Sequence, residues 1–278
     1  MDYELDQETK MIKTAVAEFS KKELAPNAAE TDRSHIFPKT AWNKLSKLDC
    51  MGLLTAEKYG GLSYGYDAMV AVMEELSKGC VATAGTYCVH LTTQYLLQTF
   101  GSEELKDRYL HRMTTGEIIG AISISEPEAG SDIASMCSSA EKVGDKCVLN
   151  GNKIFVTTAG EADIYLILVK TSPEKKHRGM SIIVVEKGMN GFKFGKIEEK
   201  MGYSGSPTGE LLFSNCAVPV SNLLGEEGQG FNMLMGALDR GRISVGAIGL
   251  GIAQASYEAA LAYTKKRQQF GRSLNEFQ

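Results

Sequence analysis

The sequence predicts an α+β protein in three parts: an N-terminal all-helical domain, a middle domain folded as an antiparallel β-barrel or β-sandwich, and the first part of a C-terminal helical bundle. Two observations predict this order. Apolar residues recur with a helical period up to about residue 115 and again after Leu224. The segment between them consists of short β-branched and aromatic runs separated by turn residues. We therefore place the domains at residues 1–115, 116–222 and 223–278, and expect the last one to be incomplete.

Helices in the first domain are indicated by caps and by spacing. After Asp6, a typical N-cap, apolar residues recur at i, i+3, i+4 and i+7. These residues are Ile12, Ala15, Val16 and Phe19. Further helices are expected after Pro38, over Asp67–Gly79 and Val81–Phe100, and from Ser102.

Short runs of β-branched and aromatic residues indicate strands in the middle domain. The runs are Ile119–Ser125, Lys146–Leu149, Ile154–Thr158, Ile164–Lys170, Met180–Glu186, Phe192–Ile197 and Glu210–Phe213. Turn signals stand at Gly144-Asp145 and Asn150-Gly151, and the Asn-Gly pair between two short runs predicts a β-hairpin. No G-x-G-x-x-G motif follows a strand, so a Rossmann dinucleotide site is not indicated.

One long helix is predicted from Gly241 to Gln269. Its first half contains Gly246, Gly249 and Gly251, and each glycine inside a helix costs about 1 kcal/mol relative to alanine. We interpret these glycines as positions where another helix or a neighbouring subunit packs closely.

Composition argues against several classes of protein. A net charge of -4 over 278 residues, without a Lys/Arg-rich run interleaved with aromatic residues, argues against a nucleic-acid partner. The six cysteines form no C-x-x-C pair and have no histidine at zinc spacing, which indicates reduced thiols and no metal site. Acidic residues at the start argue against a targeting peptide, and no apolar run reaches membrane-spanning length. We expect a soluble cytoplasmic protein of bacterial type, or a mitochondrial matrix protein if the chain is processed from a eukaryotic precursor.

The strongest local signal is the segment Ala121–Asp132, with the sequence AISISEPEAGSD. A strand runs into a turn fixed by Pro127 and Gly130, which exposes backbone N–H groups and hydroxyls. Such a turn can hydrogen-bond the polar edge of a flat ring or a phosphate. Taken alone, an ordinary polar turn is the commoner explanation.

This segment resembles the first signature of the acyl-CoA dehydrogenase family, in which a small hydroxyl residue, Glu-Pro and Ala-Gly-Ser-Asp recur. Further segments resemble the same family in the same order, so that the resemblance covers essentially the whole chain. They are Glu57–Gly61, Gly101–Lys106, Asn150–Thr157, Leu224–Phe231, Leu238–Arg242 and Arg267–Gly271. An ordered series is more specific than any one motif. The loop Met201–Thr208 departs from the family in lacking an arginine that is frequent there.

The resemblance implies FAD as cofactor and an acyl-CoA thioester as substrate. The residues implied to line or contact the flavin ring are Ile122, Ile124, Ser125, Ser131, Phe155, Val156 and Thr157. Phe155 would lie beside the ring and shield it from water, and the Thr157 hydroxyl would donate toward the ring nitrogen that accepts hydride. Ser131 would also contact the acyl-CoA. From the residues alone, Phe155 is more simply a strand-core residue.

The long helix carries the other implied contacts. Asp239 and Arg242 share a helix face and would line the acyl-CoA channel, although their spacing also suits a surface ion pair. Arg267 would reach the FAD pyrophosphate of a neighbouring protomer, because its planar guanidinium bonds two phosphate oxygens at once. Further FAD contacts are implied for Phe270, Phe277 and Gln278.

The family reaction removes an α proton from the thioester while the β carbon passes a hydride to the flavin, which yields a 2-enoyl-CoA. This reaction needs a carboxylate base in a dry pocket. Most of the family place that base near the C-terminus, beyond residue 278 here, and a minority place it at the position of Gly241. Glu126 and Glu210 are nearby acids for which we expect structural roles. No catalytic base is identified, and we expect the chain as given to be inactive or impaired.

The resemblance implies two kinds of partner: an electron-transfer flavoprotein, and further copies of the chain in a tetramer or dimer. Two alternatives stay open. One is an oxygen-reducing flavoprotein similar to acyl-CoA oxidases or nitroalkane oxidases, and the other is a non-catalytic binding or assembly fragment. The sequence does not define the acyl chain length, although Gly241 favours short-chain substrates.

Overall fold

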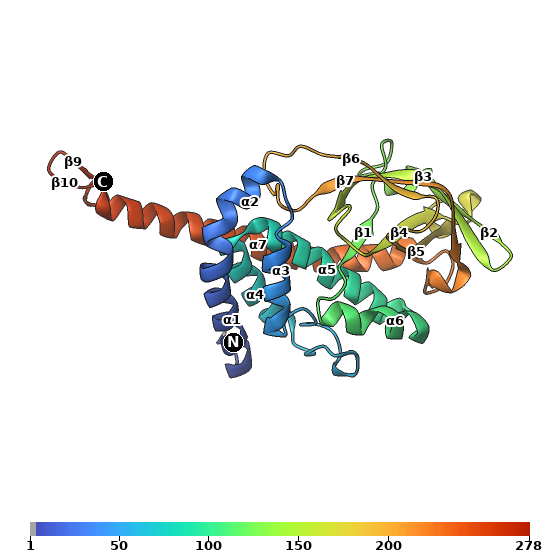
Figure 1. Ribbon diagram of the computed structural model, residues 1–278, viewed down its shortest axis with the longest axis horizontal. Coiled ribbons are helices and arrows are strands. Elements are labelled where there is room, and N and C mark those ends of the chain that lie inside the picture. The colour runs from blue at the N-terminus through green and yellow to red at the C-terminus, as the bar shows by residue number, and fades with distance from the viewer. Residues whose placement is uncertain (1–3) are drawn as a thin grey trace.

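The computed structural model describes residues 4–278, and three parts follow one another along the chain (Figure 1). Helices form the first part, a β-sheet the second, and one long helix most of the third. The N-terminal helices are α1 (Gln7–Phe19), α2 (Ala28–Ser34), α3 (Lys39–Leu45), α4 (Tyr66–Gly79), α5 (Val81–Phe100) and α6 (Glu103–Thr114). Among the described helices, none is long and apolar enough to cross a membrane.

The caps determine where these helices begin. The Asp6 carboxylate accepts a hydrogen bond from the Thr9 N–H at 2.7 Å, which confirms Asp6 as the N-cap of α1. The Ser102 hydroxyl accepts from the Leu105 N–H at 3.3 Å and opens α6 in the same way. Helix α5 spans the predicted residues, and α4 begins at Tyr66, directly before the predicted Asp67.

The middle part is one eight-stranded sheet. Its strands are β1 (Gly120–Ser123), β2 (Ser139–Val143), β3 (Lys146–Thr157), β4 (Ile164–Lys170), β5 (Met180–Glu186), β6 (Phe192–Ile197), β7 (Thr208–Pro219) and β8 (Leu223–Leu224). They are hydrogen-bonded in the order β6-β7-β3-β2-β4-β5-β8, and β1 pairs with β4.

The three-part α+β class is confirmed, but the middle sheet differs from the prediction in two ways. Its strands are not all antiparallel, because β1 and β2 each run parallel to β4. The sheet also does not close into a barrel, since no pairing within residues 4–278 joins its outermost strands β6 and β8. The parallel pairing of β1 follows from the connection through α6, which brings the chain into the sheet alongside β4 and not through a hairpin.

The hairpin predicted at Asn150-Gly151 is wrong. Both residues lie inside the continuous strand β3, and the hairpin turns instead at Gly144-Asp145, between β3 and the unpredicted strand β2. The register of β3 against β7 shifts just before Gly151. Gly151 has a φ of 147°, and a Cβ atom there would overlap the Ser138 side chain. Glycine at position 151 therefore permits a bulge in the long strand and the close approach of the Ser138 side chain to its backbone.

Helix α7 (Gly230–Lys266) makes up most of the third part and begins well before the predicted Gly241. It packs against α4 and α5 and then extends past the helical domain (Figure 1). Beyond it the chain forms a small hairpin of β9 (Gln268–Gln269) and β10 (Arg272–Ser273) at the far end of the helix. This hairpin lies far from the sheet.

The predicted close packing of α7 is confirmed at one of its three glycines. A Cβ atom at Gly251 would overlap the backbone carbonyl of Glu74 on α4, so only glycine permits this helix contact. Gly246 and Gly249 face open space, and no close neighbour within the described residues explains them.

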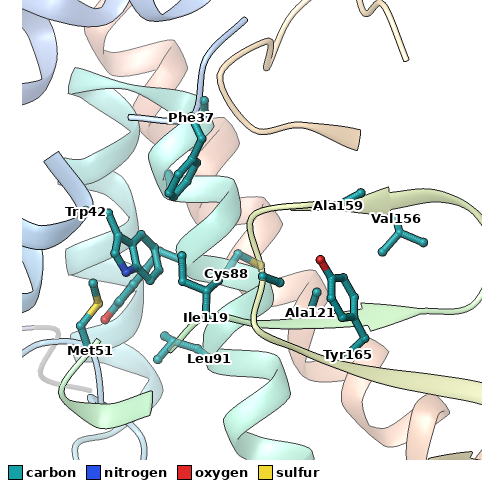
Figure 2. Packing of buried hydrophobic residues seen from close by; sticks show 14 of the residues in the cluster. Phe37, Trp42, Met51, Cys88, Leu91, Ile119, Ala121, Val156, Ala159 and Tyr165 are labelled. Carbon is teal, nitrogen blue, oxygen red and sulfur yellow. The ribbon is translucent and has the colours of Figure 1, made fainter. Parts of the chain in front are cut away.

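The hydrophobic core is continuous from the helices into the sheet (Figure 2). Trp42 of α3 packs edge-on against His90 of α5, with ring centroids 5.3 Å apart. Cys88, on the same helix, lies between Trp42 and the strand residues Ala121 and Tyr165 in Figure 2. Because such a core is close-packed, α5 and the sheet cannot shift relative to each other without opening it.

We predict that Gly151→Ala destabilises the protein by about 1–3 kcal/mol more than Gly144→Ala does, because only the first substitution adds overpacking. Both glycines have positive φ, but the Cβ of Gly144 would meet open space. Denaturant unfolding of the two variants measures the difference. Equal losses of unfolding free energy would show that the Ser138 contact has no energetic consequence.

Candidate functional site

One cleft of about 510 Å³ opens between the sheet and helices α5 and α7. Its lining residues come from β1 and the segment after it, from the end of β3, and from one face of each helix. They are Cys88, Val89, Thr92, Ile122, Ile124, Ser125, Ile154, Phe155, Val156, Thr157, Leu234, Ala237, Leu238, Gly241, Arg242 and Val245. The cleft therefore brings together both sequence motifs that resemble flavin-contacting segments.

The first wall is the segment that leaves β1. Strand β1 pairs with β4 through Ser123, and the chain then continues past Ile124 and Ser125 toward β3. There the Ile154 N–H donates to the Ser125 carbonyl at 2.9 Å. Ile122 and Ile124 are half-buried, so this wall presents apolar surface to the cleft.

The second wall is the bulged end of β3. The register of β3 against β7 shifts between Lys153 and Val156, and Phe155 has a φ of 56°. A positive φ is costly for a bulky side chain and persists only where the surrounding structure fixes it. The bulge leaves the Phe155 side chain 61% exposed in the cleft instead of buried in the sheet. This outcome contradicts the simple strand-core interpretation of Phe155.

The polar groups of these walls suit a flat, partly polar ring. The hydroxyls of Ser125 and Thr157 border the cleft, and neither has a hydrogen-bond partner in the described part of the chain. The buried hydroxyls of Ser123 and Thr158, next to the lining residues, are also without partners there. Apolar surface with a few unpaired polar groups is typical of a cofactor site, and it fits the flavin that the resemblance implies.

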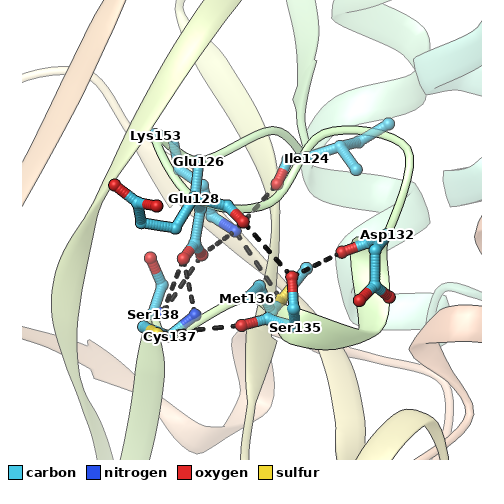
Figure 3. Close-up of polar contacts among 9 residues, drawn as sticks. All are labelled: Ile124, Glu126, Glu128, Asp132, Ser135, Met136, Cys137, Ser138 and Lys153. Carbon is cyan, nitrogen blue, oxygen red and sulfur yellow. Dashed lines mark hydrogen bonds and ion pairs between the residues drawn. The ribbon is translucent and has the colours of Figure 1, made fainter.

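A buried ion pair joins the two walls at their bases (Figure 3). The Lys153 ammonium donates to the Glu126 carboxylate at 2.7 Å and to the Ile124 carbonyl at 3.1 Å. Glu126 also accepts from the N–H groups of Cys137 at 2.6 Å and Ser138 at 3.1 Å. The Lys153 side chain is fully buried and that of Glu126 is 5% exposed.

The protonation of this pair follows from its contacts. Burial by itself raises the pKa of Glu126, but the hydrogen bonds from Lys153 and Ser138 outweigh it and hold that pKa below its usual value. Burial lowers the pKa of Lys153, and the contact with Glu126 opposes that shift. Glu126 therefore serves as an anchor, in agreement with the structural role expected for it.

The two helix faces complete the cleft, and sequence reasoning missed most of them. On α7 the lining positions 234, 237, 238, 241, 242 and 245 follow one another at helical spacing. On α5 they are Cys88, Val89 and Thr92. The α7 stripe was visible in the sequence as spacing, but a stripe alone does not distinguish a cleft from a buried core.

Several predicted site residues lie elsewhere. Ser131 and Asp239 are exposed, and neither lines the cleft, whereas Arg242 does. No ion pair within residues 4–278 joins Asp239 to Arg242. The residues implied to contact FAD from the end of the chain lie at or beyond the end of α7, far from the sheet that forms one side of this cleft (Figure 1). They are Arg267, Phe270, Phe277 and Gln278, of which Phe270 is 95% exposed.

A second, more polar pocket of about 370 Å³ lies at the start of α7. It is lined by His177 and Arg178 from the loop between β4 and β5, by Glu227, Gly228 and Gln229, and by Asn232. The loop carries the run Lys175-Lys176-His177-Arg178. This concentration of positive charge beside a helix N-terminus suits an anionic group.

No carboxylate lines the cleft among the described residues. Glu126 is occupied by Lys153 and the loop N–H groups, and Glu210 accepts from the Lys196 N–H at 3.1 Å on the β6–β7 edge. Both acids therefore have the structural roles expected for them. No cluster of His, Cys, Asp and Glu in residues 4–278 is suited to a metal ion.

We predict that Lys153→Met costs about 3–5 kcal/mol of unfolding free energy at neutral pH, because it leaves the Glu126 carboxylate buried without its counter-charge. In the wild type the lowered pKa of Glu126 contributes stability above its unfolded value of about 4.3, and this contribution is lost as the pH falls through the lower folded pKa. In the variant the unpaired carboxyl can protonate, so the difference in unfolding free energy between wild type and variant becomes smaller on acidification. Denaturant unfolding at neutral pH and at about pH 4 measures this. Lys146→Met, at an exposed position on the same strand, is the control. A difference in unfolding free energy that does not change with pH would contradict the role of Lys153 as the counter-charge of Glu126.

The chain matches one family along most of its length. Residues 6–117 match the N-terminal domain of acyl-CoA dehydrogenases, residues 121–216 the middle domain and residues 228–278 the C-terminal domain. All of the chain aligns with the short-chain-specific acyl-CoA dehydrogenase of Clostridium acetobutylicum, with 40% identity over 74% of that protein.

Solved structures agree. Butyryl-CoA dehydrogenase from Megasphaera elsdenii is 37% identical with a TM-score of 0.97, over 100% of this chain and 74% of that one. A chain in a structure described as the electron-transferring flavoprotein of Acidaminococcus fermentans is 42% identical with a TM-score of 0.98, over 100% of this chain and 73% of that one. From these matches and the cleft geometry, this chain belongs to the acyl-CoA dehydrogenase family, a family of FAD-dependent oxidoreductases that is involved in fatty-acid β-oxidation.

Proposed function

We propose that the cleft binds FAD together with an acyl-CoA thioester, and that this chain provides the binding part of an α,β-dehydrogenation site whose product is a 2-enoyl-CoA. One observation carries the proposal. The residues of two separate motifs face the α7 stripe across a single cleft, and no carboxylate lies among the lining residues. The cleft is thus suited to binding while lacking the group that removes the α proton.

The proposed flavin contacts come from both walls. Bound FAD supplies a ring that accepts two electrons as a hydride. Ile122 and Ile124 offer the ring an apolar surface, Val156 supports it from the sheet, and Phe155 covers it from water. The unpaired hydroxyls of Ser125 and Thr157 are available to its polar edge.

The proposed substrate path runs along α7. Gly241 and Arg242 line the cleft, and a Cβ at Gly241 would meet nothing within 4 Å, so the acyl group has room there. The pocket at His177 and Arg178 lies at the start of the same helix and suits the phosphates of CoA. Asp239 lies on α7, and Ser131 lies in the loop between β1 and β2. Both are exposed and remain proposed substrate contacts, and Ser131 also remains a proposed FAD contact.

We propose no residue of the cleft lining as the base that abstracts the α proton. The ionisable side chains that line the cleft are Cys88 and Arg242. Burial raises the pKa of the Cys88 thiol, and a guanidinium is a permanent cation, so neither accepts a proton at neutral pH. We therefore propose that the 278-residue chain binds its ligands but turns over acyl-CoA slowly or not at all.

We propose an electron-transfer flavoprotein as the electron acceptor, supported by the strong likeness to a chain in a structure of such a protein. The alternative acceptor is molecular oxygen. Reoxidation of chemically reduced, FAD-loaded protein separates the two, because an oxidase recovers its colour rapidly in air and a dehydrogenase needs the partner flavoprotein.

Further copies of the chain are the other proposed partner. Helix α7 exposes large apolar side chains along its outer surface: Ile243, Leu250, Ile252, Tyr257 and Tyr263. A row of this kind is typical of an interaction surface. It supports a homo-oligomer, a dimer or tetramer, in which Arg267 and Phe270 would reach a neighbour's FAD, with Phe277 and Gln278 beside them.

We predict that the purified chain takes up FAD, giving a visible flavin band, and that butyryl-CoA added afterwards leaves this band oxidised. The walls of the cleft explain the uptake, and the missing carboxylate explains the lack of bleaching. Absorption spectra before and after each addition test both steps. A protein that stays colourless would favour the non-catalytic binding or assembly fragment, and rapid bleaching would contradict the proposed lack of a base.

We predict that Gly241→Glu raises the rate of flavin bleaching by butyryl-CoA roughly 100- to 10,000-fold, the usual contribution of a positioned general base. The substitution puts a carboxylate into open space that borders the cleft. Gly246→Glu is the matched control, because it adds the same charge to α7 in open space outside the cleft lining. An equal rate in both variants would show that the Gly241 position does not face the reacting carbons.

A further inference from the structure

The connection between β6 and β7 reaches from the sheet to the N-terminal helices (Figure 1). We call its residues Lys200–Pro207 the docking loop. Within it the Lys200 ammonium donates to the Tyr203 carbonyl at 3.0 Å and to the Thr208 hydroxyl at 2.8 Å, which holds the loop in a closed turn. These hydrogen bonds give the loop a fixed conformation, so a contact at one of its ends can affect the residues at the other.

Tyr203 is the residue by which the loop contacts α5. A Cβ atom at Gly85 would overlap the Tyr203 ring carbon Cε1 and would stand 2.8 Å from Cζ, so the ring fills the space that the glycine leaves. Tyr203 has a φ of 64°, a conformation that is strained for an aromatic residue. The strain indicates that the loop is built around the placement of this ring.

Two further contacts fix the loop to the helices. The hydroxyls of Ser206 and Thr86 are 3.1 Å apart, and both residues are buried. The Ser204 N–H donates to the Asp32 carboxylate at 3.4 Å, and Gly205 packs closely against Thr31 of α2. The loop is thus anchored at several points around Tyr203.

The helix and the loop that meet at the Tyr203–Gly85 contact are each connected directly to residues that line the cleft. On one side, Gly85 lies on α5 ahead of Cys88, Val89 and Thr92, which line the cleft. Burial raises the pKa of Tyr203 to about 12, and the thiols of Cys88 and Cys80 add to this shift. On the other side, the Pro207 carbonyl accepts from the Thr158 N–H at 2.7 Å, directly after the lining residue Thr157.

We propose that Tyr203 is a positioning residue for the flavin cleft. Its ring, seated against Gly85, sets the separation between the α5 face and the bulged end of β3, so that Phe155 and Thr157 stand at the right distance for FAD. This inference rests on the proposed function, because it assumes that FAD binds in the cleft that these two surfaces border.

The test measures the FAD dissociation constant and the shape of the bound flavin absorption band for the full chain and five variants. Tyr203→Ala removes the ring, and Gly85→Ala displaces it. Each is expected to weaken FAD binding about tenfold and to change the band, which reports the ring environment directly. The double variant is expected to bind no worse than Tyr203→Ala, because without the ring the added methyl meets no obstacle.

Two controls separate positioning from general damage. Tyr203→Phe should bind as the wild type does, since the Tyr203 hydroxyl has no hydrogen-bond partner within residues 4–278. Met201→Ala, at an exposed position in the same loop, should also have no effect. Thermal unfolding of each apo variant accompanies the titrations.

Variants that lose thermal stability but keep the wild-type FAD affinity and band would overturn the proposal, because Tyr203 would then be only a structural contact. Additive losses in the double variant would also overturn it. If Tyr203→Ala fails to fold, Gly85→Ala and Tyr203→Phe decide the question, because the proposal expects only the first of these to weaken FAD binding and change the band. A wild type that takes up no FAD would instead overturn the proposed function, and this inference with it.

Discussion

The geometry of the cleft depends on the buried pair of Lys153 and Glu126. Each residue stands directly next to a wall: Glu126 follows Ser125, and Lys153 precedes Ile154. Burying an unpaired ion costs several kcal/mol, so removing either side chain would leave the other as an uncompensated buried charge. The ammonium is further held by the Ile124 carbonyl and the carboxylate by two loop N–H groups. The pair therefore fixes two segments that are distant in sequence, and the strained backbone of Phe155 persists because its neighbour is anchored.

Sequence patterns predicted the elements whose signals are local. The strands Ile164–Lys170 and Met180–Glu186 were predicted at their observed limits, because they are buried on both faces and form continuous apolar runs. The Asn150-Gly151 hairpin failed because a rule about two residues was overridden by pairing along the whole of β3 with β7. Strand β2 was missed because its residues are mostly exposed and polar, and only its partners hold it in the sheet.

The site residues, like the helices and strands, were predictable where their signal is local in the sequence. Six of the seven residues predicted to contact the flavin ring line one cleft, because each motif is a short segment whose backbone path its own residues fix, whereas Ser131 does not line it. The α5 and α7 faces were missed, since Thr92 or Ala237 has the same character as a core residue until the opposite wall is known. Arg267 and Phe270 lie beyond the end of α7, away from this chain's own cleft, so their proposed role can only concern another protomer.

Binding and proton transfer are physically separable in this architecture. The walls need a bulge, a buried ion pair and a docked loop, all of which are coupled to packing, so a substitution there disturbs the fold. Gly241 is different: a side chain at this position borders the cleft but meets no other atom within 4 Å. A carboxylate there would change the chemistry of the cleft without repacking any neighbour, and replacing glycine inside a helix would be favourable for the helix itself. The fold therefore constrains the proposed positions of FAD and acyl-CoA far more tightly than it constrains the side chain at position 241. For this reason the proposed binding of FAD and acyl-CoA does not depend on which side chain stands at position 241.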